Sequence, residues 1–267
     1  MKNIYFFFLI IILINAIEIK SQTAADASKH QEMMEIITQK PKFDIKTIGV
    51  FVYEGFNNLD AMGPYQVLSE VSGAKVFLIA KKKGIIKNQS KVKIQVDTSI
   101  SEVNNLDILV IPGGALETLL MTQDSSVLNW IKAIDQNSKY TTSVCTGAWI
   151  LGATGLLKDK HATTNWYRAE EMLKNYGAHF ENKRWVQDGK YWTSAGVTAG
   201  LDMSLAIVND LLGEKYTQGV MLDLEYDPNP PIKGGSVMKT QPIVRDMIKT
   251  MYDMLMLNTI NKIKLKN

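Results

Sequence analysis

Cys145 is the one cysteine among 267 residues, and its surroundings are those of a reactive thiol. It stands in the run Ser143-Val144-Cys145-Thr146-Gly147, between an apolar segment and a segment of helical character. A sharp strand-to-helix turn projects a nucleophile out of a sheet, and a nearby glycine relieves crowding where the chain reverses. We expect the start of the following helix to lower the pKa of the thiol below its ordinary value of about 8.5. The alternative is a buried, inert thiol that packs as a small hydrophobic side chain.

A paired-glycine turn is the second candidate element. Gly113 and Gly114 follow the apolar run that ends at Ile111-Pro112. Ligands of open α/β sheets bind at the carboxyl ends of the strands, where these two glycines are expected to lie. Their backbone N–H groups would then be accessible to a developing negative charge, as in an oxyanion site. A plain strand-to-loop turn explains the same residues.

Asp60 is the third candidate. It lies between apolar neighbours, in the run Leu59-Asp60-Ala61-Met62, just before Gly63-Pro64. The carboxylate either caps a helix or, if buried beside the thiol, has a raised pKa and transfers protons. The local sequence leaves both interpretations open.

The elements that position these residues are short β-branched runs that alternate with helical patterns. This alternation predicts an α/β fold. Apolar runs bounded by charged or turn residues are typical of strands buried on both faces of a sheet. We expect a flavodoxin-like three-layer sandwich, with a mainly parallel sheet and helices on both faces. The predicted strands are Ile48–Tyr53, Lys75–Ile79, Ile108–Ile111 and Tyr140–Val144, with helices that begin after Gly63-Pro64 and after Gln123-Asp124.

The chain after Cys145 continues the same alternation. Asp188-Gly189 supplies the positive φ that a tight hairpin turn needs, between strands around Trp185 and Trp192. Helices are predicted from Cys145 to Leu157, from Trp166 to Tyr176, from Ala199 to Leu212, near Gln218 to Leu224, and from Pro242 to about Lys262.

The N-terminus predicts an exported protein. Lys2 precedes an almost wholly apolar run from Ile4 to Ala16, shorter than the roughly 20 residues of a membrane span, and Ser21 offers a cleavage point. Residues 1–21 are therefore predicted to be a signal peptide, and the protein periplasmic or secreted. A retained membrane anchor is the competing interpretation, and a core helix is a weaker one.

Composition predicts one main domain. With 46% apolar and 21% charged residues the chain buries a sizeable core, and its net charge of +3 is spread out. We expect residues 22–45 to be an N-terminal extension, residues 46–236 the domain, and residues 237–267 a helical segment.

Basic runs with interleaved aromatics are absent from the sequence, and its histidines, at positions 30, 161 and 179, lack metal-binding spacing. We expect a small-molecule substrate, no cofactor or metal, no nucleic acid and no stable membrane insertion after cleavage.

Taken together, the motifs resemble the ThiJ/PfpI superfamily, within the class I glutamine amidotransferase-like fold. The resemblance covers roughly Lys46 to Ser236, and within the superfamily it is strongest to isocyanide hydratases and to the ligand-sensing domains of AraC-type regulators. It rests on Leu59-Asp60 with Gly63-Pro64, Ile111-Pro112-Gly113-Gly114, Thr142-Ser143-Val144-Cys145-Thr146-Gly147, Ala162-Thr163-Thr164-Asn165, Gly196-Val197-Thr198-Ala199-Gly200 and Leu224-Glu225-Tyr226.

This resemblance implies a homodimer and a hydratase that turns an isocyanide into an N-substituted formamide. Cys145 matches the nucleophile, Asp60 the catalytic acid and Thr146 the hydroxyl neighbour of the cysteine. Backbone amides near Gly114 and Thr146 would complete the site.

Asn165 departs from the pattern of many relatives, which have histidine there. Amide or peptide cleavage needs an imidazole to protonate an amine leaving group, and asparagine cannot do so. Hydration of an isocyanide expels no amine, so an asparagine at this position is more compatible with a hydratase than with an amidase or a peptidase. We therefore count Asn165 among the candidate substrate-binding residues. His161, four residues earlier, is expected on a strand in a structural role.

Two other functions stay open on the sequence. One is a non-catalytic binding or sensing domain, although the single helical segment after residue 236 is too short for a pair of DNA-binding helix-turn-helix units. The other is redox sensing through oxidation of Cys145 to sulfinic acid.

Overall fold

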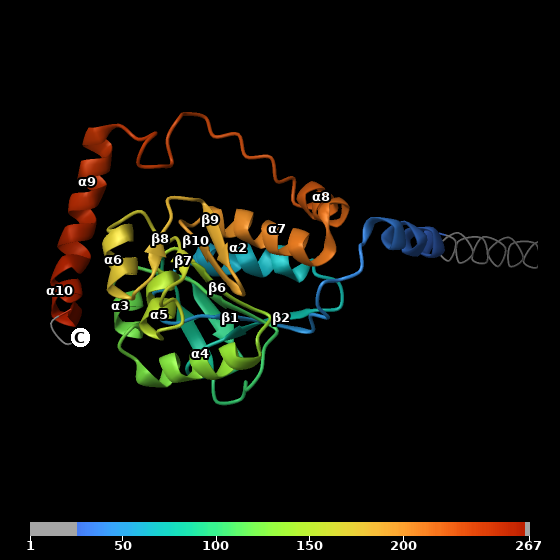
Figure 1. Ribbon diagram of the computed structural model, residues 1–267, viewed down its shortest axis with the longest axis horizontal. Helices are drawn as coiled ribbons and strands as arrows, with labels where there is room; N and C mark the ends of the chain where they lie inside the picture. The colour runs from blue at the N-terminus through green and yellow to red at the C-terminus, as the bar shows by residue number, and fades with distance from the viewer. Residues whose placement is uncertain (1–25, 265–267) are drawn as a thin grey trace, which may run out of the picture.

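A six-stranded sheet forms the centre of the computed structural model, which describes residues 26–264 (Figure 1). The strand order is β2-β1-β5-β6-β10-β9, in which five strands are parallel and only the edge strand β9 is antiparallel. The strands are β1 (Thr47–Phe51), β2 (Lys75–Ile79), β5 (Ile108–Ile111), β6 (Tyr140–Val144), β9 (Trp185–Asp188) and β10 (Tyr191–Ser194). The predicted mainly parallel sheet is confirmed, with the first strand ending at Phe51 rather than Tyr53.

Helices cover both faces of the sheet, as predicted. On one face lie α2 (Asn58–Ser69) and α7 (Ala199–Leu212), followed by α8 (Glu214–Asp223); on the other lie α4 (Ser125–Asn137) and α5 (Gly147–Ala153) (Figure 1). Every residue of β5 and β6 is buried, because both strands have helices above and below. The core therefore occupies both interfaces between sheet and helices.

Smaller elements fill the rim. Two short ribbons, β3 (Gly84–Lys87) with β4 (Lys93–Val96) and β7 (His161–Ala162) with β8 (His179–Phe180), stand apart from the main sheet. Two further helices, α3 (Leu116–Met121) and α6 (Ala169–Asn175), lie near α5. The helices predicted for residues 145–157 and 166–176 are thus shorter, because α5 gives way to turns after Ala153 and α6 begins only at Ala169.

Helical segments form both ends of the described chain, and each is connected to the domain in its own way. Residues 26–37 form a helix, after which the backbone N–H groups of Gln39 and Lys42 donate to the last carbonyls of α7. The predicted signal peptide, residues 1–21, lies outside the described residues. After α8 an exposed arm crosses the molecule to α9 (Pro242–Tyr252), a π-helical turn (Asp253–Leu257) and α10 (Asn258–Lys264) (Figure 1).

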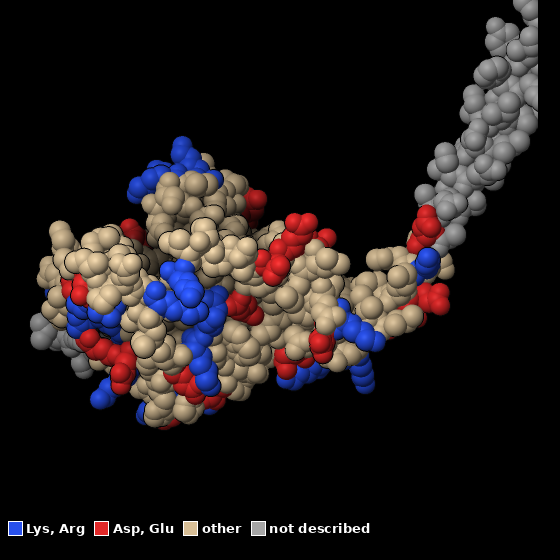
Figure 2. Space-filling model, turned by 90° about the horizontal axis from the view of Figure 1, so that it is seen from above, with Lys and Arg blue, Asp and Glu red and all other residues tan. Residues whose placement is uncertain are grey.

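Surface charges are mixed rather than gathered. Figure 2 shows Lys and Arg side chains on the face that it presents, with Asp and Glu side chains beside them. Between residues 26 and 264, no helix combines the length and the apolar character that crossing a membrane requires.

Candidate active site

Cys145 occupies a strained turn between β6 and α5. Its φ is 59°, a left-handed value that residues other than glycine rarely adopt, and α5 begins two residues later. Its backbone N–H donates to the carbonyl of Ser194 at 2.9 Å, which fixes the turn to β10. Gly147 is required here, since a Cβ at this position would lie 2.1 Å from the carbonyl oxygen of Ile111. The sequence thus folds into the predicted nucleophile elbow.

Strand register brings the glycine turn beside this elbow. Ile111 of β5 is paired with Ser143 of β6, so the chain after each strand leaves the same edge of the sheet. Phe56, in the loop after β1, forms an isolated bridge to Gly114. The neighbouring Asn57 N–H donates to the carbonyl of Gly113 at 2.7 Å. Three segments far apart in sequence therefore meet at the carboxyl ends of β1, β5 and β6.

Helix α2 begins earlier than predicted, and this places Asp60 inside its first turn. The side-chain oxygen of Asn57 accepts hydrogen bonds from the N–H groups of Leu59 at 3.1 Å and Asp60 at 3.3 Å, so Asn57 is the cap. The predicted start after Gly63-Pro64 is wrong, because Pro64 lies inside the helix. Asp60 is consequently not a cap, which leaves the interpretation as a buried acid.

Asp60 is completely buried beside Cys145. Its Oδ2 accepts the Gly113 N–H at 3.0 Å, whereas its Oδ1 has no hydrogen-bond partner among the described residues. Burial raises the pKa of this carboxyl to about 7, although the Gly113 N–H and the Cys145 side chain both lower it. Asp60 therefore exchanges its proton near neutral pH.

Burial also raises the pKa of the Cys145 thiol, and the charge of Asp60 raises it further. The Thr146 N–H and the Asn165 amide lower the pKa, but by less, so the predicted lowering by the helix start is wrong. The two acids titrate as one system, in which loss of a second proton is strongly opposed. The first proton is therefore lost near pH 7 and comes from Asp60, so the resulting negative charge resides mainly on the carboxylate while Cys145 stays a thiol.

Asn165 donates a hydrogen bond to the sulfur. Its Nδ2 is 3.3 Å from the Cys145 Sγ, while its Oδ1 accepts the Tyr167 N–H at 3.0 Å. That second bond fixes which end of the amide faces the thiol. The Thr164 hydroxyl donates to the Cys145 carbonyl at 2.8 Å. Asn165 thus stabilises negative charge on sulfur but cannot accept its proton.

The glycine turn and Thr146 are bound to each other rather than open to a ligand. The Gly114 N–H donates to the Thr146 Oγ1 at 3.0 Å, and the Thr146 hydroxyl donates back to the Gly114 carbonyl at 2.9 Å. The Gly113 N–H donates to the Asp60 carboxylate. Neither glycine therefore has a free backbone N–H for an oxyanion, contrary to the prediction. Thr146 ties the turn to the elbow, and its backbone N–H is the donor that faces the sulfur.

Two tyrosines near the site were missed by sequence reasoning. The hydroxyl of Tyr53 donates to the Pro112 carbonyl at 3.1 Å and contacts the Thr118 Oγ1 at 2.9 Å, which supports the turn. Tyr252, at the end of α9, packs against Tyr167 with ring centroids 5.1 Å apart. Neither tyrosine has a motif in the local sequence, because each reaches the site only through tertiary packing.

The remaining chemical candidates lie elsewhere. His161 is in β7, as expected, and pairs with Glu181 at 2.9 Å on the surface. Among residues 26–264, His, Cys, Asp and Glu side chains form no group of three or more that could hold a metal ion.

The fold and the site together define an α/β protein with a buried cysteine on a nucleophile elbow and an acid beside it. Residues 46–210 match the DJ-1/PfpI family, and the chain belongs to that family. The predicted family resemblance is therefore confirmed.

Particular relatives extend the comparison. An isonitrile hydratase from Pseudomonas putida is 36% identical over 189 residues, which cover 71% of this chain and 82% of that protein. A deglycase from Thermococcus kodakarensis is 28% identical over 53% of this chain and 84% of its own length. The crystal structure of a ThiJ/PfpI family protein from Pseudomonas syringae superposes with a TM-score of 0.78 at 32% identity, covering 83% of this chain and 91% of that one.

Proposed function

We propose that this protein is a cysteine-dependent hydratase that converts a small isocyanide into an N-substituted formamide. The observation that carries the proposal is the pairing of Cys145 with Asp60, a buried acid whose pKa of about 7 suits proton transfer. Asn165, the side chain that donates to the sulfur, cannot act as a base. The likeness to an isonitrile hydratase, at 36% identity, supports the same reaction.

The reaction needs one nucleophile and one proton carrier. In the singly charged pair the thiol proton moves to Asp60, and the Cys145 sulfur bonds to the terminal carbon of the isocyanide. Asp60 returns that proton to the same carbon, which gives a thioimidate. Water then adds to this carbon and a proton moves to nitrogen; the carbon–sulfur bond breaks, releasing the formamide and the thiol. The unpartnered Oδ1 of Asp60 is the atom available for these transfers.

Asn165 suits this reaction better than amide cleavage. An amide needs a group that protonates the departing amine, and the donor to sulfur here is a carboxamide, which has no proton to lose at neutral pH. Hydration retains the nitrogen in the product, so Asp60 alone suffices.

A direct assay tests the proposal. Purified protein is incubated with phenyl isocyanide, and N-phenylformamide is measured against the Cys145→Ser variant, which has the same shape without the thiol. We expect formamide from the wild type only, and the Asp60→Asn variant to lose about 10²–10⁴-fold in rate. Equal product from wild type and Cys145→Ser would refute a cysteine-dependent hydratase.

A non-catalytic small-molecule binding domain is the second candidate, and the burial of Cys145, at 5% exposed, favours it. Alkylation by iodoacetamide separates the two. A thiol that stays unmodified at neutral pH, in a protein without hydratase activity, would support binding over catalysis. Redox sensing gains nothing from the structure, because burial raises the pKa of this thiol.

A further inference from the structure

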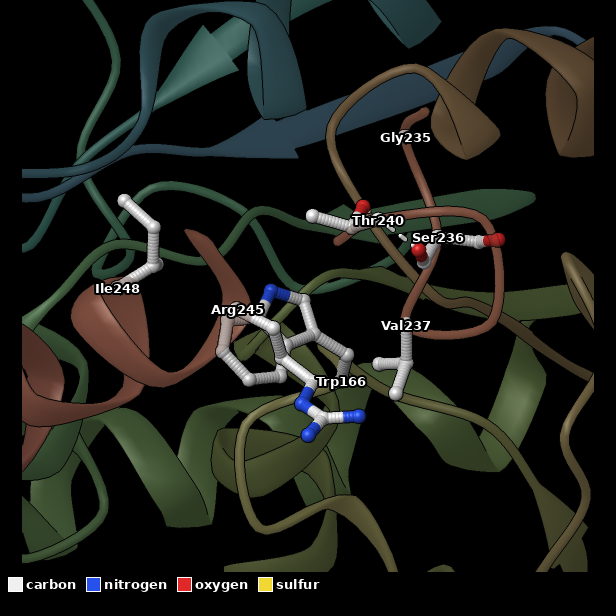
Figure 3. A pocket seen from close by; sticks show the side chains of 7 residues that line it. All are labelled: Trp166, Gly235, Ser236, Val237, Thr240, Arg245 and Ile248. Atoms are coloured by element: carbon white, nitrogen blue, oxygen red, sulfur yellow. Dashed lines mark hydrogen bonds between the residues drawn. The ribbon is translucent and has the colours of Figure 1, made fainter. Parts of the chain in front are cut away.

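A pocket of about 200 Å³ lies between Trp166 and the C-terminal segment (Figure 3). Trp166 comes from the loop before α6, whereas the other walls come from the arm and from α9. The lining is mainly apolar, with a rim of hydroxyls and one guanidinium. Besides Trp166, the lining side chains are Ser236, Val237, Thr240, Arg245 and Ile248.

The aromatic rings at this pocket belong to the segment that also contacts the cysteine. Trp166 directly follows Asn165, whose amide contacts the Cys145 sulfur at 3.3 Å. The Trp166 ring meets Tyr252 edge to face, with centroids 5.8 Å apart, and Tyr252 packs against Tyr167 at 5.1 Å. Burial raises the pKa of Tyr252, and the charges of Cys145 and Asp60 raise it further, so its hydroxyl lies within electrostatic reach of both.

The outer wall of the pocket is anchored to the domain. Asp253, next to Tyr252, accepts the Tyr167 hydroxyl at 2.8 Å and pairs with Lys249 at 2.6 Å. Further along, Met256 and Ile260 are each 1% exposed, in a cluster with Leu119, Trp149, Tyr167 and Met172. The C-terminal segment, which lies beyond the residues matched by the family, therefore forms a fixed wall beside the site.

We propose that this pocket is a subsite for the apolar substituent of the molecule that reacts at Cys145. The inference rests on the hydratase function proposed above and names its substrate class, an isocyanide with one ring or a short branched chain. An apolar cavity of about 150 Å³ holds benzene, so a volume of about 200 Å³ suits a group of this size.

A neutral substituent fits the charges better than an anionic one. Arg245 is the one cationic side chain lining the pocket, and Asp246 already pairs with it at 3.0 Å. Tyr252, whose ring contacts Trp166, has no hydroxyl hydrogen bond with any described residue, so this hydroxyl is free to donate to a polar atom of the ligand. These features give the ligand an apolar tail and a polar head that faces Cys145.

Binding of the product tests the subsite without requiring activity. Titration calorimetry measures N-phenylformamide binding to Cys145→Ala protein, alone and with Ile248→Phe, which fills the pocket, or with Ile243→Phe. Ile243 is on the same helix but 75% exposed and outside the pocket, so it is the matched control. We expect at least tenfold weaker binding with Ile248→Phe and a change below twofold with Ile243→Phe. Equal binding by both variants, or no binding by either the parent or the control, would overturn the subsite.

Kinetics separate this inference from the proposed function. If the enzyme hydrates isocyanides, Ile248→Phe should lower the ratio of kcat/KM for phenyl over methyl isocyanide at least tenfold, because methyl isocyanide does not fill the pocket. An unchanged ratio refutes the subsite and leaves the hydratase standing. Absence of all hydration with intact, Ile248-dependent formamide binding refutes the hydratase and leaves the subsite standing. Val237→Phe, on the opposite wall, repeats the test should Ile248→Phe fail to fold.

Discussion

The Nδ2 of Asn165 lies 3.3 Å from the Sγ of Cys145, and the Tyr167 N–H holds the amide in that orientation. The Thr146 N–H is a second donor to the sulfur. Both donors stabilise a thiolate, and neither accepts a proton. Asp60, whose pKa of about 7 lies near neutrality, is therefore the neighbour of the sulfur that can take up and return a proton.

Replacing this donor by a charge should make the thiol less reactive. In Asn165→Asp a carboxylate faces the sulfur, which opposes the thiolate and removes a hydrogen bond. We expect alkylation by iodoacetamide at pH 7.5 to slow at least tenfold. Asn182→Asp makes the same change at an exposed position and should leave the rate unchanged. An Asn165→Asp rate equal to that of wild type would show that the contact with sulfur has no effect on reactivity.

The pH dependence of alkylation should report the coupling between Asp60 and Cys145. Because Asp60 has a pKa of about 7, the wild-type rate should rise in a step centred near pH 7, level off, and rise again only at much higher pH. Asp60→Asn removes the proton acceptor, so the step near pH 7 should vanish. Asp97→Asn, an exposed control, should retain it. A single rise near the pKa of free cysteine in wild type would contradict a coupled pair.

Burial of Asp60 should make the folded state less stable as pH rises. Its pKa moves from the ordinary 3.8 to about 7, so the stabilisation from the protonated acid is complete below pH 3.8 and is lost as pH rises through 7. This shift in the pKa corresponds to a change of about 4 kcal/mol in the free energy of unfolding. In a Cys145→Ala background, which leaves one titrating group, the free energy of unfolding should fall relative to Asp60→Asn between pH 4 and pH 8. Urea titrations at both pH values measure the difference, and a constant difference would argue against a raised pKa.

The sheet could be predicted from sequence because its signals are local. Runs such as Ile108–Ile111 are buried on both faces and read as continuous apolar segments, and Asp188-Gly189 fixes the hairpin between β9 and β10. The start of α2 differs from the prediction because Pro64 is typical of a first helical position, whereas the Asn57 cap decides the boundary.

The properties of the site depend on contacts that no local pattern contains. The direction of the Cys145 pKa follows from its burial and from Asp60, which lies 85 positions earlier. The Gly113 and Gly114 N–H groups could be placed at the correct edge, but which acceptors they choose depends on α2 and on the elbow. Tyr252 lies near the site because an exposed arm crosses the molecule and brings α9 there, which no local pattern in the sequence indicates.

Close backbone approach should make Gly147 irreplaceable. An added Cβ would meet the Ile111 carbonyl oxygen at 2.1 Å, and this oxygen belongs to backbone that cannot yield without moving β5 away from the elbow. We expect Gly147→Ala to cost more than about 3 kcal/mol or to prevent folding. Gly219→Ala is the matched control, since Gly219 is exposed in α8 with nothing within 4 Å of the added carbon. That change should raise stability by about 0.5–1 kcal/mol. Equal melting temperatures for the two variants would contradict this account.

Docking of the C-terminal helices should depend on Met256. This side chain is 1% exposed among Leu119, Trp149 and Tyr167, so truncation to alanine leaves a cavity that costs about 2–5 kcal/mol. Because α9 and α10 hold Tyr252 beside the site, the cost should appear first as local undocking. We expect the backbone amides of Lys249 and Tyr252 to exchange with solvent deuterium at least about tenfold faster in Met256→Ala. Met254, two positions earlier and 84% exposed, is the control, and its alanine variant should exchange as wild type does. If the two variants exchange alike, the buried cluster does not hold the helix in place.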